Sequence, residues 1–433
     1  MADPVFLLAG AGAVGAGQVG PKAATLARLR QAGLPIPDGF CLAADAYRAH
    51  LAAAGLAEVA GRVGQANEGE AGRLALHVRV GLLSAPLDAP VAQCLKARYR
   101  QLSPEADPLV AVRSSALSED TPGASFAGQL DTLLGVSGHD ELLTAVRACW
   151  ASLWSSRALR YMEARDADPA RTAVAVLVQC LVPARVAGGA LSRTPDSRLV
   201  VTAAWGLGPA VAQGDVVPDR YVFQLDPLRL ERMEPGHKDR RLTCAGGKGP
   251  EWQAVAPHLV TAPCLGEADA VALARLVLAV EAVLGRQVEI EWALDDRSFQ
   301  ILQARPLGVQ ENLPAGEPRL GHPALTGQPA GIGRGAGPAC VVRSEAELAR
   351  VRPGDVLVTR VPGPALAAVL SRVAGVIAEL GGSTSHLAAL ARERGIPAVL
   401  GVPNATRLIH DGALVVVDGT AGAIHWLRNE GTA

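Results

Sequence analysis

An α/β (α+β) fold in two parts is predicted by three features of this 433-residue sequence. Residues 1–306 alternate between helical and strand periodicities, a pattern typical of mixed helices and strands. A stretch crowded with proline and glycine follows at 307–330. It favours neither a long helix nor a central strand, and it predicts a linker. Residues 331–433 return to an α/β pattern and predict a smaller second domain.

Each predicted element rests on a local pattern. Helical periodicity predicts helices at 22–33, 42–60, 88–101, 139–164 and 267–285. Runs rich in β-branched residues predict strands at Leu109–Arg113, Ala173–Gln179, Leu199–Ala203, Tyr221–Leu225, Val288–Leu294 and Phe299–Arg305. In the smaller part, strands are expected at 356–359, 373–377, 398–400 and 414–417, with a helix at 387–394 that ends at Gly395 and Pro397.

Composition excludes several classes of protein. The formal net charge is -1, so no broad basic face is available for nucleic acid or for an anionic membrane. The seven cysteines are odd in number and form no CxxC pair, which argues against a disulfide framework or a zinc site and favours reduced thiols in the cytoplasm. The apolar run Val5–Gly17 is too short to span a bilayer, and we interpret it as buried β-structure.

A glycine pattern at Gly10–Gly15 formally matches the dinucleotide-binding fingerprint. That fold also needs a second strand ending in an acidic residue about 20 residues later. Here the position falls near 32–38, inside a break that contains glycine and proline. The sequence therefore disfavours a dinucleotide site.

Arg113 lies at the end of an apolar strand and precedes a long loop of small residues, Glu119–Gln129. An arginine at a strand end can bind polyphosphate with its bidentate fork, and free backbone N–H groups in such a loop can wrap a phosphate tail. The alternative is an ordinary hydrophilic surface loop. Phe126, placed among small residues, argues mildly against that alternative.

The segment Val288–Pro306 is expected to form a hairpin that places Glu291 opposite Gln303 and Glu289 opposite Arg305. A carboxylate and an amide oxygen are hard ligands that suit Mg²⁺, and the arginine can neutralise phosphate charge. Taken alone, however, the segment fits better with a solvated strand face that carries a cross-strand ion pair.

The segment Gly381–His386 gives the strongest indication of chemistry. Its glycines permit a tight turn, and its hydroxyl residues can cap the helix that follows. His386 would lie in the first helical turn, where the positive end of the helix dipole favours a neutral imidazole and attracts phosphate. A phosphoryl-accepting nucleophile requires this environment. A histidine that only caps or packs at a helix start remains an equal alternative for this segment alone.

Taken together, these segments resemble the phosphoenolpyruvate synthase / pyruvate phosphate dikinase family over most of residues 5–306 and 330–427. The resemblance implies an ATP-grasp domain at 1–306, a linker at 307–330 and a swivelling phosphohistidine domain at 331–433. Gly206–Gly208 and Pro218–Tyr221 also look like family signatures. The resemblance assigns phosphate or nucleotide contacts to Lys22, Arg113, Gly128, Gln129, Gln179 and Arg305, metal ligation to Glu291 and Gln303, and phosphorylation to His386.

The activity implied by the resemblance is a dikinase-type phosphotransfer that uses ATP and Mg²⁺. The β-phosphate passes to His386 and then to an acceptor, with AMP and inorganic phosphate as products. Neither the pyruvate-binding barrel of the family nor the drug-binding domain of the related rifampin phosphotransferases is recognisable here. We therefore expect a small-molecule acceptor presented by a separate subunit. A ligase working through the same phosphohistidine and a non-catalytic nucleotide-sensing module remain alternatives.

Overall fold

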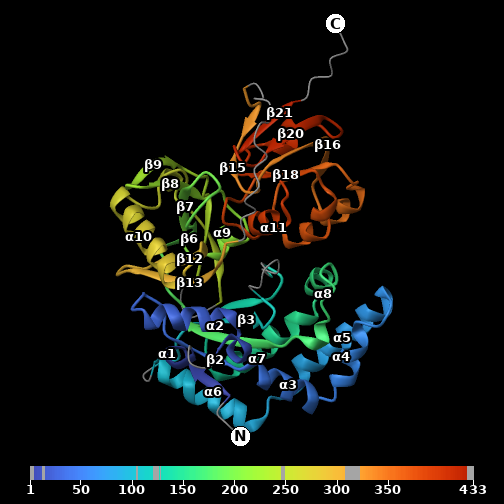
Figure 1. Ribbon diagram of the computed structural model, residues 1–433. Helices are drawn as coiled ribbons and strands as arrows, with labels where there is room; N and C mark the ends of the chain where they lie inside the picture. Colours follow the sequence, from blue (N-terminus) through green and yellow to red (C-terminus); the bar gives the residue numbers. More distant parts are fainter. Residues whose placement is uncertain are drawn as a thin grey trace. The chain divides into compact units, whose positions relative to one another are not determined.

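The computed structural model describes residues 4–11, 15–103, 106–119, 126, 128–244, 249–307 and 322–426. The chain forms two compact units (Figure 1). Unit 1 comprises 1–183, 243–251 and 297–305, and unit 2 comprises 184–242, 252–296 and 306–433. The predicted domain boundaries at 306 and 331 stay a prediction. Within the described ranges, no helix is long and apolar enough to cross a membrane.

Unit 1 is built on a five-stranded sheet in the order β1-β2-β5-β3-β4. The strands are β1 (Val5–Leu7), β2 (Gly39–Leu42), β3 (Val110–Ala116), β4 (Thr132–Val136) and β5 (Val174–Cys180). Every neighbouring pair in this sheet is antiparallel. A dinucleotide-binding unit needs parallel neighbours joined by a helix, so the antiparallel order agrees with rejecting the fingerprint at Gly10–Gly15.

Helices of unit 1 pack on this sheet and beside it, and α2, α3 and α7 each contact its central strand β5. Their bounds are α1 (Leu8–Ala11), α2 (Ala16–Gln31), α3 (Ala44–Ala53), α4 (Ala57–Val63), α5 (Glu68–Ser84), α6 (Ala89–Leu102), α7 (His139–Ala151) and α8 (Ser156–Glu163).

Four predictions for this part need correction. The single helix expected at 42–60 is two helices, α3 and α4, because Gly55 takes the left-handed conformation between them. The helix expected at 139–164 is likewise broken by the 3₁₀ turn Ser152–Trp154, after which Ser155 caps α8. Helix α5 was not predicted, although Asn67 caps it by accepting a hydrogen bond from the Glu70 N–H. The run Val5–Gly17 is a strand only at β1, and α1 follows directly.

The N-terminal part of unit 2 is an antiparallel sheet whose strands lie in the order β12-β6-β7-β8-β9. Helix α10 (Glu267–Leu284) contacts β12, β7 and β9, and the short helix α9 (Pro209–Ala212) contacts β6 and β7 (Figure 1). The strand bounds are β6 (Val186–Leu191), β7 (Arg198–Trp205), β8 (Asp219–Leu225), β9 (Leu228–Glu234) and β12 (Val288–Leu294). The short strands β10 (Arg240–Thr243) and β11 (Glu251–Ala254) pair with each other, and β13 spans Phe299–Pro306.

The C-terminal segment of unit 2, residues 322–426, contains an eight-stranded sheet in the order β14-β21-β20-β16-β17-β18-β19-β15. Strands β16 to β19 are parallel neighbours, and they enclose a core of valine, isoleucine and alanine. The bounds are β14 (Leu325–Thr326), β15 (Gln328–Pro329), β16 (Arg334–Val342), β17 (Val356–Thr359), β18 (Gly375–Ala378), β19 (Ala398–Leu400), β20 (Leu414–Asp418) and β21 (Ala423–Trp426).

Part of the predicted linker is strand instead. β14 and β15 lie at the two edges of the eight-stranded sheet, paired with β21 and β19. Proline is tolerated at sheet edges, where the missing N–H is not needed by a further strand. Residues 308–321, the rest of the predicted linker, lie outside the described residues.

Candidate active site

Lys22 is buried in unit 1 at a kink in α2. Gly20 adopts φ 76° and ends the regular geometry of the preceding turn, so Pro21 opens the next helical segment, a position that suits proline. A side chain on Gly20 would collide with Ser115, since its Cβ would lie 2.4 Å from Ser115 Oγ. The Lys22 N–H donates to the same oxygen at 3.3 Å, and Lys22 Nζ forms a buried ion pair with Glu119.

Arg113 is buried on β3, and its guanidinium reaches β13. It donates 2.7 Å hydrogen bonds to the Leu302 carbonyl and to Gln303 Oε1. Gln303, the predicted metal ligand, is itself buried, and Arg305 is partly buried on the same strand. The structure therefore brings Arg113 and Gln303 together and contradicts the solvated strand face for Gln303.

The glycine-rich segment after Arg113 is described only in part, because 120–125 and 127 lie outside the described residues. Phe126 is buried against Tyr161, with ring centroids 4.7 Å apart, so the hydrophilic-loop alternative is wrong for this residue. Gly128 adopts φ 68°, and Gln129 is buried, with its carbonyl accepting a 2.9 Å bond from Arg157 Nε.

Gln179 is buried on β5, and its Nε2 has no hydrogen-bond partner among the described residues. Its register partner on β3 is Ala111, and directly opposite residues of an antiparallel pair share one face. Ala111, Arg113 and Ser115 alternate along β3 and so share that face as well. Gln179, Arg113 and the Ser115 that contacts Lys22 therefore line one face of the sheet. The amide of Gln179 is a buried donor suited to a nucleobase acceptor.

In unit 2, residues on neighbouring strands form a row across the antiparallel sheet. Register places Glu291 opposite Gly189, Gly189 opposite Thr202, and Thr202 opposite Arg220. Because opposite residues share a face, this row lies on one side of the sheet. Arg220 ends the row in an ion pair with Glu234 at 3.1 Å.

The loop before His386 packs on this row. A Cβ on Gly189 would lie 2.6 Å from the Cβ of Thr384, so only glycine leaves room for the loop there. The Thr384 hydroxyl hydrogen-bonds to the hydroxyl of Thr202. Thr384 therefore covers Gly189, the residue that stands directly opposite the predicted metal ligand Glu291.

His386 begins α11 (His386–Arg394), as predicted within one residue. Ser385 caps the helix and accepts from the Ala388 N–H at 3.3 Å, and Gly395 ends it in the left-handed conformation. Residues 381–385 and 387–391 are buried, whereas the His386 side chain is partly exposed. The helix start thus presents one accessible imidazole in a closely packed loop.

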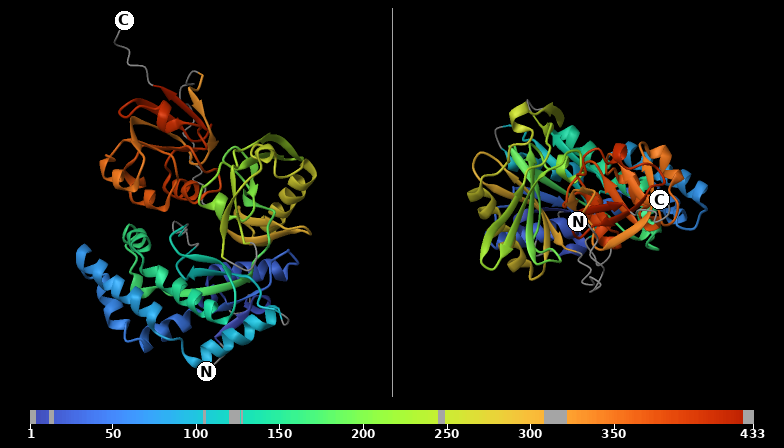
Figure 2. Two further views of the ribbon diagram at one scale, coloured as in Figure 1. Left: turned by 180° about the vertical axis from the view of Figure 1, so that it is seen from behind. Right: turned by 90° about the horizontal axis from the view of Figure 1, so that it is seen from above.

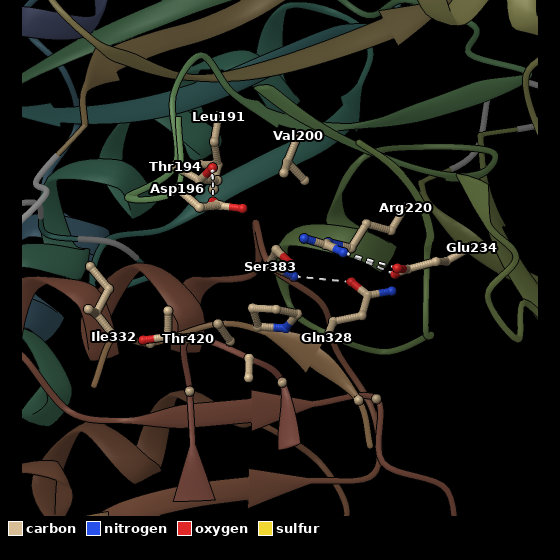
Figure 3. A pocket seen from close by; sticks show the side chains of 18 of the residues that line it. Leu191, Thr194, Asp196, Val200, Arg220, Glu234, Gln328, Ile332, Ser383 and Thr420 are labelled. Carbon is tan, nitrogen blue, oxygen red and sulfur yellow. Dashed lines mark hydrogen bonds and ion pairs between the residues drawn. The ribbon is translucent and has the colours of Figure 1, made fainter. Parts of the chain in front are cut away.

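Figure 3 shows the side of this loop that faces a cavity of about 680 Å³ within unit 2. The Ser383 N–H donates to Gln328 Oε1 at 3.3 Å, and Gln328 Nε2 donates to the Pro218 carbonyl at 2.7 Å. Gln328, which stands on β15, therefore links the histidine loop to the strand β8 region. In both views of Figure 2, the orange-to-red C-terminal segment lies beside the green-to-yellow sheet.

Glu289 does not lie on a solvated strand face either. It is buried, and its Oε2 accepts a 3.0 Å bond from Arg392 on α11. Arg392 also donates to the Ser383 carbonyl at 2.6 Å. Sequence reasoning missed Arg392, Thr202 and Glu119, because an arginine, a threonine or a glutamate carries no local signal of a partner about 100 or more residues away along the chain.

Two of the sequence signatures have structural roles. Asp219 is fully buried; it pairs with Lys238 and accepts 2.7 Å bonds from the Gly236 and Cys264 N–H groups. Gly206 adopts φ 80°, and a Cβ there would meet the Leu242 carbonyl oxygen at 2.3 Å. Asp219 therefore fixes the backbone at Gly236 and Cys264, and Gly206 permits a close approach to Leu242.

The fold and these residues define a class of proteins: an ATP-grasp nucleotide-binding region joined to a small α/β segment that presents a histidine at a helix N-terminus. A family model described as "Pyruvate phosphate dikinase, AMP/ATP-binding domain" matches residues 16–318. The chain belongs to this family. A second model, "PEP-utilising enzyme, mobile domain", matches residues 351–422.

Curated relatives agree with this assignment. The chain is 32% identical to "Probable phosphoenolpyruvate synthase" of Methanothermobacter thermautotrophicus, over 94% of this chain and 61% of that protein. It is 32% identical to "Phosphoenolpyruvate synthase" of Aeropyrum pernix, over 94% of this chain and 56% of that protein. The enzyme of the same name from Deinococcus radiodurans is 33% identical, over 91% and 53%. The chain therefore spans little more than half the length of these relatives.

Proposed function

We propose that this chain is an ATP-dependent phosphotransferase of the dikinase type, in which ATP phosphorylates His386 and the phosphohistidine then passes its group to an acceptor. The observation that carries this proposal is the contact of Thr384 with Gly189, directly opposite Glu291. The histidine loop thus packs on β6, and the candidate metal ligand Glu291 lies on the neighbouring strand β12. A histidine that only capped a helix would need no such neighbour.

In this proposal, the residues of unit 1 bind ATP, and none of them acts as the nucleophile. Arg113 and Lys22 would neutralise phosphate charge, and Arg305 is a third cation for that purpose. Gln179, with its unpartnered buried amide, would hydrogen-bond to the adenine ring. Catalysis would then rest on positioning and charge neutralisation, as in other phosphoryl transfers.

Mg²⁺ fits the donor set if it is held mainly through the nucleotide. The described part of the chain contains no group of three or more His, Cys, Asp or Glu residues that could hold a metal ion. Mg²⁺ commonly takes one or two protein oxygens together with substrate phosphates. Glu291 and Gln303 Oε1 would be those oxygens; the amide oxygen accepts from Arg113 and keeps a second lone pair. When bound, the ion would stabilise charge on the phosphate oxygens.

The proposed phosphoryl transfer takes place in three steps. The His386 imidazole attacks the β-phosphorus, the bond from that phosphorus to the bridging α-oxygen breaks, and AMP leaves with the electron pair. Water removes the terminal phosphate as inorganic phosphate, so the histidine keeps a single phosphoryl group. The acceptor then displaces the histidine nitrogen from phosphorus.

The decisive experiment uses ATP labelled at the β-phosphate. Wild-type chain should acquire acid-labile, base-stable label, and His386→Ala should acquire none. His425→Ala, at a partly buried histidine on β21, is a matched control that should label normally. Equal labelling of wild type and His386→Ala would show that another group is the nucleophile.

We further propose that the acceptor is a small molecule bound mainly by a separate polypeptide. The support is that the matched regions, 16–318 and 351–422, are taken up by the nucleotide-binding and histidine parts. Phosphorylated chain should therefore keep its label when pyruvate alone is added, and lose it when a partner captured from the native host is added with its substrate. Rapid discharge by the purified chain alone would place the acceptor pocket within it.

A further inference from the structure

We propose that Glu289 and Arg392 form a docking latch: a buried ion pair that holds the histidine loop in register on the sheet of unit 2 and that must open whenever the loop leaves. This inference rests on the proposed function, because a loop that carries phosphate must reach two sites in turn. Neither residue would touch ATP. Both are positioning residues for His386.

The geometry of Arg392 joins three parts of unit 2 in one side chain. Its Nη2 donates to Glu289 Oε2 on β12 at 3.0 Å. Its Nη1 donates to the Ser383 carbonyl at 2.6 Å and to the Ala330 carbonyl at 3.4 Å. Arg392 on α11 thus connects the loop just before His386 to strand β12.

Burial makes this ion pair sensitive to small displacements. The side chains of Glu289 and Arg392 are 9% and 8% exposed. A buried ion pair gains little net stability, because the charges lose their hydration, but removing one partner leaves an uncompensated buried charge. An apolar contact of the same area would instead hold the loop whether or not the register was correct.

The same balance explains how the latch can open. When the loop leaves, both charges regain water, which offsets most of the attraction that is lost. The contact is therefore strict in geometry and weak in net affinity. A domain that docks and leaves in every catalytic cycle needs both properties.

The neighbouring contacts depend on this register. Glu289 and Glu291 share one face of β12, since they are two residues apart. The Thr384–Thr202 hydrogen bond and the Thr384–Gly189 contact lie on the same face. Loss of the ion pair should therefore weaken both contacts of Thr384 with the sheet.

The test measures single-turnover labelling of His386 from β-labelled ATP in Glu289→Gln. The maximal rate should fall at least ten-fold while the ATP concentration for half-maximal rate stays unchanged, because nucleotide binding is intact. The double variant Glu289→Gln/Arg392→Gln should recover part of the rate, since it removes both charges of the ion pair. Glu231→Gln is the matched control. Glu231 pairs with Arg198 at the surface of the same sheet, and its substitution should leave the labelling rate of His386 unchanged.

A second measurement needs no ATP. Amide hydrogen exchange in 381–386 should be faster in Glu289→Gln than in wild type, with exchange in the core strands β17 and β18 unchanged. If Glu289→Gln does not fold, Arg392→Lys replaces it: the lysine keeps the charge but loses one of the two arms, so exchange in the loop should still rise.

The outcomes separate the two proposals. Unchanged labelling and unchanged exchange in Glu289→Gln would overturn the latch while leaving the proposed function intact. Absence of label in the wild-type chain would overturn the proposed function, and the exchange experiment would still decide whether the ion pair holds the loop.

Discussion

Replacing Gly189 with alanine should separate docking of the histidine loop from folding of the sheet. The added Cβ would lie 2.6 Å from Thr384 Cβ, 2.7 Å from its Oγ1 and 3.1 Å from its Cγ2. Ordinary contacts of this kind lie between 3.4 and 4 Å. The loop must therefore move by roughly 1 Å, whereas β6 itself accepts alanine at an ordinary strand position.

The magnitude follows from the cost of overpacking. Inserting a methyl group into a closely packed contact costs about 1–3 kcal/mol. If that cost falls on the docked arrangement, its population drops by a factor of about 5–150, at roughly tenfold per 1.4 kcal/mol. The labelling rate of His386 should drop by the same factor, while the melting temperature changes little.

The assay is single-turnover labelling beside a thermal melt. Gly363→Ala and Gly266→Ala are matched controls, because a Cβ at either position would meet nothing within 4 Å. Both should label at the wild-type rate. A wild-type rate in Gly189→Ala would refute the reasoning, since it would show that the Thr384 contact has no part in phosphorylation. A large loss of melting temperature would show that the methyl group strains the sheet instead.

Three further predictions concern buried charge. Lys22→Ala should lower the free energy of unfolding by about 3–5 kcal/mol in urea titration, because Glu119 loses its buried ion pair with Lys22, and adding Glu119→Gln should restore part of it; equal stability of all three chains would contradict this. Asp219→Ala should cost about as much, because Lys238 loses its buried partner, and a loss below 1 kcal/mol would show that solvent enters there. Burial lowers the pKa of His50, so the unfolded chain binds the extra proton, and the free energy of unfolding should fall as pH drops below about 6.5. His50→Gln should flatten that pH profile, and an unchanged profile would point to other groups.

Local patterns are enough to predict the elements that hold the candidate site residues. The strand before Arg113, the two strands at 288–306 and the helix that starts at His386 form within a few residues of their predicted bounds. Each is determined by neighbours in sequence: an apolar run, an alternation or a cap. The fold class is also predicted, because both parts of the sequence mix helical and strand patterns.

Pairings across the chain could not be predicted in the same way. The hairpin pattern places Glu289 opposite Arg305, and that register stays a prediction; the ion pair of Glu289 with Arg392, 103 positions away, has no signal in either local segment. Register in β6, β7 and β12 decides that Gly189, Thr202 and Glu291 form a row, and no single segment contains that information. Burial of Gln303 likewise depends on Arg113, which is 190 positions distant.

Glycine at the contacts of the histidine loop would affect how fast the loop returns, if it docks repeatedly as proposed. Gly189 faces Thr384, Gly214 faces Pro362, and Gly382 faces Pro218; a Cβ at each position would lie 2.4–2.6 Å from these neighbours. Glycine and proline have no side-chain rotamers to immobilise, unlike lysine or methionine, which lose up to about 2 kcal/mol of conformational entropy each when they are fixed. If the loop docks and leaves as proposed, the two contacts with proline would therefore fix few side-chain conformers on each return.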